Sequence, residues 1–172
     1  MKDKDCKYRV VTPSPLGPPR TPKIVSFRAE NNAFQTVNAD DTDVIMFPSV
    51  LYDCVTPPGN YDPATSAFTA PCDGIYHFTS SAFLSASIGT SALIFIVKLV
   101  GVNQMIIACD SIRFTGDLES GCVNVSTSIN LLCGEQVQVQ LSASSGNVTI
   151  DQNTDENRPT CFTGEIVNDM CP

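Results

Sequence analysis

The side chains of this 172-residue chain that could do chemistry are one histidine, eight cysteines and eighteen carboxylates. Hydrolysis by a serine or cysteine enzyme needs a nucleophile, a base and a group that orients the base. The single histidine, His77, lies in a segment with the pattern of a β-strand, and no Gly-x-Ser-x-Gly motif occurs. One histidine without clustered carboxylates also does not supply a hydrolytic metal site. We therefore expect no enzyme, and a Cys–His nucleophile pair is the only catalytic arrangement left open.

The cysteines are widely spaced, even in number and never arranged as Cys-x-x-Cys, which favours disulfides over zinc. Cys109 and Cys122 flank one loop between predicted strands and are a candidate intrachain pair. Cys133 is in phase with apolar residues of a predicted strand, which predicts a buried free thiol. Spacing alone does not select the other pairings. The disulfide candidates are Cys6, Cys54, Cys72, Cys109, Cys122, Cys161 and Cys171.

Composition limits the partners and the compartment. The formal net charge is −8, so the surface repels phosphate backbones and we expect no nucleic-acid partner. The longest apolar run, Ala92–Val97, is too short to span a bilayer. No signal peptide is visible in the charged N-terminus. We expect an extracellular or surface location, reached as a mature fragment, without a secretion signal, or by assembly into a spore or virion coat.

The chain divides into three parts. Residues 1–22 are rich in proline and predict an extended tail or spacer. Glycine does not recur at every third position there, so no collagen triple helix is expected. Residues 23–167 carry the strand pattern of one domain, and residues 168–172 form a short C-terminal tail.

Apolar residues recur at every second position through most of residues 23–167, and no helical period persists. Many short alternating segments separated by glycine or proline predict an all-β fold of two antiparallel sheets. The predicted strands are Ile24–Ala29, Val44–Phe47, Val50–Tyr52, Ile75–Leu84, Leu93–Leu99, Gln104–Ala108, Val123–Leu131, Val137–Leu141 and Cys161–Val167.

Residues Tyr61–Phe78 carry a specific combination: Tyr-Asp, a turn, Phe, Pro, Gly and then Tyr-x-Phe. This order resembles the globular head of complement C1q, in the C1q/tumour-necrosis-factor jelly-roll superfamily. Ser66 stands where that family has a turn glycine, and Glu135 stands where Asp is usual. The final predicted strand resembles the family's closing strand. The resemblance implies a jelly-roll sandwich and a homotrimer in which each inner sheet packs around a threefold axis.

The resemblance also implies roles for individual residues. The family's core aromatic positions fall on Phe68, Tyr76, Phe78 and Phe162. Its calcium ligands fall on Asp110 and Asp117, so calcium is the one possible cofactor. Asp40, Asp41 and Asp43 form a second acidic cluster in an early loop. Because the termini of such domains emerge together, Cys6 and Cys171 are placed to cross-link within or between subunits.

The resulting hypothesis is a trimeric C1q-like binding or adhesion module that recognises protein or glycan ligands multivalently. The alternative is a structural cap or coat subunit of a spore, virion or appendage. A cytokine-like ligand is a third reading, and a hydrolytic enzyme is the last. A coat subunit would be recovered cross-linked in particles, whereas a soluble binding module would not.

Overall fold

The computed structural model describes residues 24–54, 59–115, 120–152 and 160–169, and the fold is built from strands alone within them. The predicted tails therefore lie almost wholly outside the described residues. The strands are β1 Ser26–Glu30, β2 Gln35–Val37, β3 Thr42–Val44, β4 Ser49–Asp53, β5 Tyr61–Asp62, β6 Ala67–Thr69, β7 Gly74–Ala86, β8 Ser91–Val100, β9 Asn103–Arg113, β10 Ser120–Leu131, β11 Gln136–Ser144, β12 Val148–Ile150 and β13 Cys161–Asp169.

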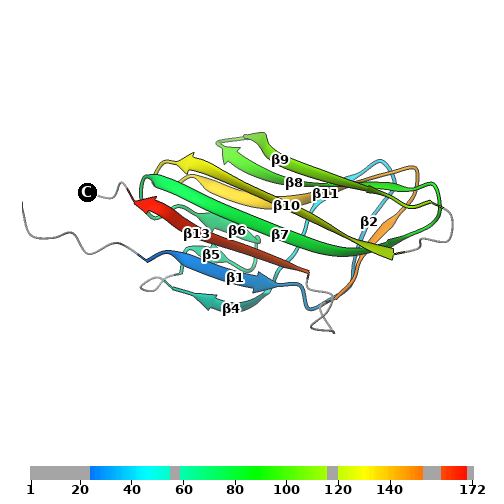
Figure 1. The fold of residues 1–172 in the computed structure, drawn as a ribbon, viewed down its shortest axis with the longest axis horizontal. Coiled ribbons are helices and arrows are strands. Elements are labelled where there is room, and N and C mark those ends of the chain that lie inside the picture. Colours follow the sequence, from blue (N-terminus) through cyan, green and yellow to red (C-terminus); the bar gives the residue numbers. More distant parts are fainter. Residues whose placement is uncertain (1–23, 55–58, 116–119, 153–159, 170–172) are drawn as a thin grey trace, which may run out of the picture.

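Two antiparallel sheets form the sandwich of the predicted jelly roll (Figure 1). The first sheet, which we call sheet A, runs β2-β12-β7-β13-β1-β4, with β10 paired to the other side of β7. The second, sheet B, runs β5-β6-β11-β8-β9, with β3 also paired to β11. Strand β9 contacts β10 across the sandwich, so these two lie on one side of the molecule. Strand β4 is then the edge on the opposite side, as Figure 1 shows.

The core lies between the sheets and follows the alternation of the sequence. In β10 the inward residues Val123, Val125 and Leu131 are buried, while the residues between them are mostly exposed. The four core aromatics implied by the resemblance are also buried, with exposed fractions of 1% or less. Burying a large aromatic side chain removes much apolar surface from water, which makes this the main stabilising region of the domain.

Aromatic rings fill the end of the core between β1, β6, β7 and β13. Phe27 stacks on Tyr61 at 4.8 Å and on Phe68 at 5.1 Å between ring centroids. Phe78 lies 5.4 Å from Phe68 and 5.9 Å from Phe162. These separations are in the range of favourable aromatic pairs. The ring cluster thus joins both sheets.

Several strand boundaries differ from the predictions. Of the predicted strand Val44–Phe47 only Val44 lies in a strand, because β3 runs Thr42–Val44. Strand β9 continues to Arg113 instead of ending at Ala108, so Asp110 lies in a strand and not in a loop after the hairpin. Strand β9 is exposed along most of its length because it is an edge, and this removes the alternation that marks a half-buried strand. Near the N-terminus, β1 begins at Ser26 and leaves Ile24 exposed.

Ser66 explains how the turn works without the family's glycine. Its backbone φ is 52°, in the left-handed region that favours glycine, and its side chain is fully buried. The hydroxyl accepts a hydrogen bond of 2.8 Å from the backbone N–H of Phe47. The carbonyl of Phe47 accepts a hydrogen bond from the hydroxyl of Tyr61. Burial raises the pKa of the Tyr61 phenol to about 12. The serine hydroxyl therefore compensates for backbone strain by satisfying a buried donor.

This arrangement predicts an order of stability among Ser66 variants. Ser66→Ala should lose about 1–3 kcal/mol, because it leaves the Phe47 N–H without its acceptor and keeps the strained backbone. Ser66→Gly loses the same acceptor but relieves the strain, so it should fall between alanine and wild type. Urea unfolding at equal protein concentration measures the three. An alanine variant as stable as wild type would show that the hydroxyl contributes nothing.

Candidate functional site

The outer face of sheet A is polar and lined with small side chains. Outward residues of β7 alternate with core residues, and each faces a partner on the neighbouring strands in the antiparallel register. His77 lies between Glu165 of β13 and Ser128 of β10, and Thr79 lies between Thr163 and Ser126. Hydroxyl, imidazole and carboxylate groups are therefore brought together from three strands that are distant in the sequence.

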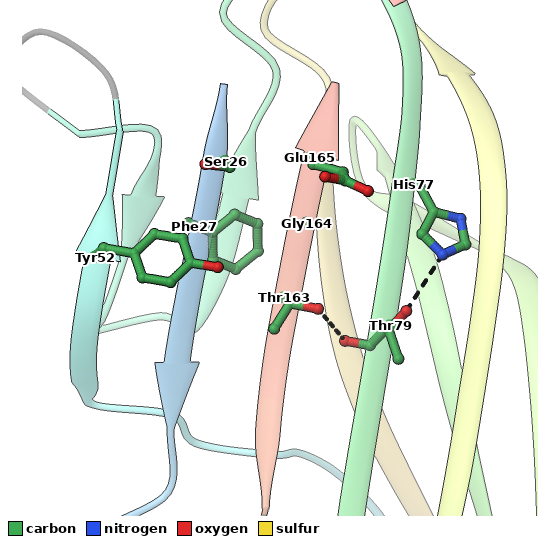
Figure 2. A pocket seen from close by; sticks show the side chains of 8 residues that line it. All are labelled: Ser26, Phe27, Tyr52, His77, Thr79, Thr163, Gly164 and Glu165. Atoms are coloured by element: carbon green, nitrogen blue, oxygen red, sulfur yellow. Dashed lines mark hydrogen bonds between the residues drawn. The ribbon is translucent and has the colours of Figure 1, made fainter. Parts of the chain in front are cut away.

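A depression of about 340 Å³ crosses this face over β4, β1, β13 and β7 (Figure 2). Tyr52 lies on one side and His77 on the other, and the small floor residues let an incoming group approach the sheet closely. The depression is lined by Ser26, Phe27, Tyr52, His77, Thr79, Thr163, Gly164 and Glu165. These side chains offer donors and acceptors for hydrogen bonds to hydroxyl or peptide groups.

The imidazole of His77 is held by two hydroxyl groups. Its Nδ1 lies 3.0 Å from the Oγ of Ser128, and its Nε2 lies 3.4 Å from the Oγ1 of Thr79. Catalysis would need a carboxylate or amide to orient the ring while the other nitrogen activates a nucleophile. Here hydroxyls occupy both positions, and a Cys–His pair is not formed among the described residues. The geometry suits a group that binds and positions a ligand.

Of the two implied calcium ligands, only Asp110 is among the described residues. Asp110 is on β9 opposite Ile94, and its Oδ1 accepts a hydrogen bond of 2.8 Å from the N–H of Ser111. Asp117 lies outside the described residues. Within those residues no group of three His, Cys, Asp or Glu side chains is placed to hold a metal ion. Calcium binding at this pair stays a prediction.

Glu135, the residue at the family's Asp position, anchors the turn between β10 and β11. Its carboxylate pairs with the Lys98 ammonium group and accepts a 2.8 Å hydrogen bond from the N–H of Leu132. Burial by itself raises the pKa of Glu135. The hydrogen bonds from Lys98 and Leu132 and the charge of Lys98 together outweigh burial, so the pKa is below its usual value.

The lowered pKa makes this ion pair a source of acid sensitivity. A carboxylate whose folded-state pKa is depressed stabilises the fold above its unfolded pKa of about 4.5, and this is lost as the pH falls through the folded value. Glu135→Gln should therefore flatten the fall in melting temperature below pH 4.5, and Lys98→Met should weaken it similarly. Thermal unfolding from pH 3 to pH 6 measures the slopes. Identical slopes for wild type and Glu135→Gln would contradict the assignment.

The predicted pairing of Cys109 with Cys122 is wrong, because both are free thiols. Cys109 is on β9 opposite Phe95 in sheet B, whereas Cys122 is on β10 opposite Phe83 in sheet A. The loop that the two cysteines flank thus joins strands of different sheets. The number of residues between Cys109 and Cys122 therefore did not indicate how far apart their side chains lie.

The other cysteines divide as follows. Cys54 and Cys161 form no disulfide within the described chain, and they do not pair with each other because β1 separates β4 from β13. Cys133 is free but exposed, because β10 ends at Leu131 and places Cys133 in the following turn. Cys72 is disulfide-bonded, and none of the other described cysteines is its partner. Cys6 and Cys171 lie outside the described residues, so their bonding stays a prediction.

Two exposed apolar patches lie on opposite edges of the sandwich. The β9 patch comprises Met105, 47% exposed, and Ile106, 58% exposed. The β4 patch comprises Val50, Leu51 and Tyr52, which are 37%, 56% and 45% exposed. Both patches are on edge strands whose backbone groups have one unpaired side. Edge strands with apolar side chains are usually covered by another surface.

Comparison with known families decides the relationship that the motifs suggested. A family model of the C1q domain matches residues 26–167, most of the chain and nearly all of the sandwich. The chain belongs to the C1q domain family. No curated protein sequence is similar enough to count as a close relative of this C1q domain.

Solved structures confirm the C1q and tumour-necrosis-factor jelly-roll fold. The globular domain of zebrafish complement 1qA is similar with a TM-score of 0.53 at 20% identity, covering 84% of this chain and 98% of that one. Murine APRIL at pH 5.0 has a TM-score of 0.63 at 8% identity, covering 84% and 100%. Eiger TNF from S. frugiperda has a TM-score of 0.58 at 12% identity, covering 83% and 91%.

The depression on sheet A was not predicted for this C1q domain, although His77 was singled out. Alternation in β7 gives the outward direction of His77 and Thr79, but nothing in the sequence shows that β13 pairs with β7 and that β1 pairs with β13. Residues 52, 77 and 165 come together only through the sheet order.

The described residues contain no helix long and apolar enough to span a bilayer.

Proposed function

We propose that this C1q domain is a homotrimeric, non-catalytic binding module that is displayed outside the cell or on a surface. It recognises protein or glycan ligands through three equivalent sites. Family membership supports a ligand-binding module, and the hydroxyl partners of His77 give a hydrolase no support. Three weak sites held in one particle bind a multivalent target far more tightly than one site does.

The main observation in support of a trimer is the placement of the two apolar patches. A ring of subunits needs two different surfaces that meet head to tail, whereas a twofold dimer needs one self-complementary surface. The β9 patch and the β4 patch are different surfaces on opposite edges of the sandwich, which supports head-to-tail association. Such association closes into a ring when the rotation from subunit to subunit returns to the first one. Association through them would remove both exposed edges from water.

Light scattering on the purified protein tests this assembly. We expect a mass three times the 18.5 kDa of one chain at micromolar concentration. Ile106→Asp should reduce the mass to that of a monomer, because it places a charge in the β9 patch. Ile88→Asp is the matched control, since Ile88 is 62% exposed but outside both patches. A stable wild-type monomer would overturn the proposal.

The ligand class is tested by probing glycan and protein arrays with the intact trimer. Binding to a defined class that is lost in Ile106→Asp at equal subunit concentration would support multivalent recognition. A second variant, His77→Ala with Glu165→Ala, asks whether the depression on sheet A contributes, because both residues line it and neither belongs to an apolar patch. Equal array binding by the wild type and the monomeric variant would contradict the role of multivalency.

A structural coat subunit is the second candidate, favoured by the four exposed free thiols Cys54, Cys109, Cys122 and Cys133. Exposed thiols are able to join neighbouring molecules into a covalent layer once the surroundings become oxidising. Fractionation of the source distinguishes the two functions. A coat subunit would be recovered in particles that dissolve only with reductant.

A further inference from the structure

The five free cysteines of the described chain fall into two groups by the environment of their sulfur atoms. The Sγ atoms of Cys122, Cys133 and Cys161 are hydrogen-bonded within their own domain, to Asn124 and Val123, to Pro71 and to Ser81. The Sγ atoms of Cys54 and Cys109 make no such bond to any described residue, and both cysteines are exposed. These two thiols are therefore the least engaged within the domain.

The same two cysteines lie at the two apolar patches. Cys54 directly follows β4, and its backbone N–H donates to the carbonyl of Ser26, which fixes it beside the β4 patch. Cys109 lies within β9, three residues after Ile106. The edges that carry them are on opposite sides of the sandwich. Cysteines on opposite edges cannot bond within one chain, because a disulfide requires Cα atoms within about 7 Å.

We propose that Cys54 of one subunit forms a disulfide with Cys109 of the next, so that oxidation locks the trimer covalently. This inference rests on the proposed head-to-tail association of the β4 and β9 patches. Each subunit then gives Cys54 to one neighbour and Cys109 to the other, and three bonds close the ring. The result is a particle whose avidity survives dilution.

The chemistry requires an oxidant of the disulfide class, such as oxidised glutathione. The thiolate of one cysteine attacks a sulfur of glutathione disulfide and releases one glutathione, forming a mixed disulfide. The thiolate of the other cysteine then attacks the protein sulfur of that mixed disulfide and releases the second glutathione. Two thiols are oxidised to one disulfide, one glutathione disulfide is reduced to two glutathione molecules, and the two protein protons leave with them.

To test this, the 172-residue protein is incubated with oxidised glutathione and its remaining free thiols are then blocked. The products are separated on a denaturing gel without reductant. The wild type should run as a covalent trimer, and Cys54→Ser and Cys109→Ser should each run as a monomer. Cys133→Ser, which removes an exposed thiol away from both patches, should still give the trimer. When the two single variants are co-assembled, one complementary pair remains, so a covalent dimer should form.

Light scattering in the presence of reductant tests the non-covalent trimer separately from the disulfide that would link its subunits. A trimer in reductant with no Cys54- and Cys109-dependent cross-link after oxidation would overturn the disulfide and leave the trimer intact. A monomer in reductant would overturn the proposed assembly itself. Cross-linking that survives in Cys54→Ser as a dimer would show a symmetric Cys109 contact between particles instead, which also overturns the proposal.

Discussion

Replacing Phe78 with alanine is expected to lower the free energy of unfolding by about 3–5 kcal/mol, a large part of the roughly 5–15 kcal/mol by which folded domains are stable. The side chain is fully buried. It contacts the rings of Phe68, Tyr76 and Phe162, with centroid distances of 5.4, 6.3 and 5.9 Å. Truncation removes these contacts and leaves a cavity between the two sheets, which the surrounding rings cannot fill without leaving their own positions.

Urea unfolding of wild type and Phe78→Ala at the same protein concentration measures the loss, because assembly makes apparent stability depend on concentration. Phe34→Ala is the matched control. Phe34 is 64% exposed, so its truncation should change stability by no more than about 0.5 kcal/mol. A Phe78→Ala variant with a wild-type transition would mean that this residue does not support the core.

Much of the sandwich could be predicted because a half-buried strand alternates apolar and polar residues, which shows which side chains face the core. In β10 the apolar residues fall at alternate positions, with Thr127 as the polar exception, and this face is turned toward the core. The same alternation places Tyr76 and Phe78 inward on β7 and His77 outward. Residues that are exposed on both faces carry no such signal, and β9 was consequently predicted five residues too short at its C-terminal end.

Contacts between distant strands could not be predicted in the same way. The depression beside Tyr52 depends on β4 lying next to β1 and on β13 lying between β1 and β7. The pairing of Cys109 with Cys122 failed for the same reason, because adjacency in the chain does not say which sheet each strand joins. Sequence reasoning found His77 and the core aromatics, whose identity and phase are local properties. It missed the groups that only the sheet order brings together.

Gly164 shows how one close approach depends on that sheet order, and it gives the second large expected effect. Gly164 lies on β13 opposite Phe27 of β1 and Phe78 of β7. A Cβ atom added at Gly164 would lie 2.5 Å from the Cε1 of Phe27 and 2.7 Å from Phe78. Those distances are shorter than carbon atoms tolerate, and both rings are held by their aromatic neighbours. Gly164→Ala should therefore cost about 1–3 kcal/mol or more through overpacking.

A double-mutant cycle separates overpacking from any backbone effect of the new side chain. Phe78→Leu alone should destabilise the domain because it loses ring contacts, but it also makes room beside Gly164. Combined with Gly164→Ala, the two changes should cost less than the sum of the single variants, with a coupling of about 0.5–3 kcal/mol. The free energies come from urea unfolding of the four proteins. Strict additivity would mean that the alanine methyl group does not meet the Phe78 ring, and the packing of β13 against β7 would then have to differ from the one described.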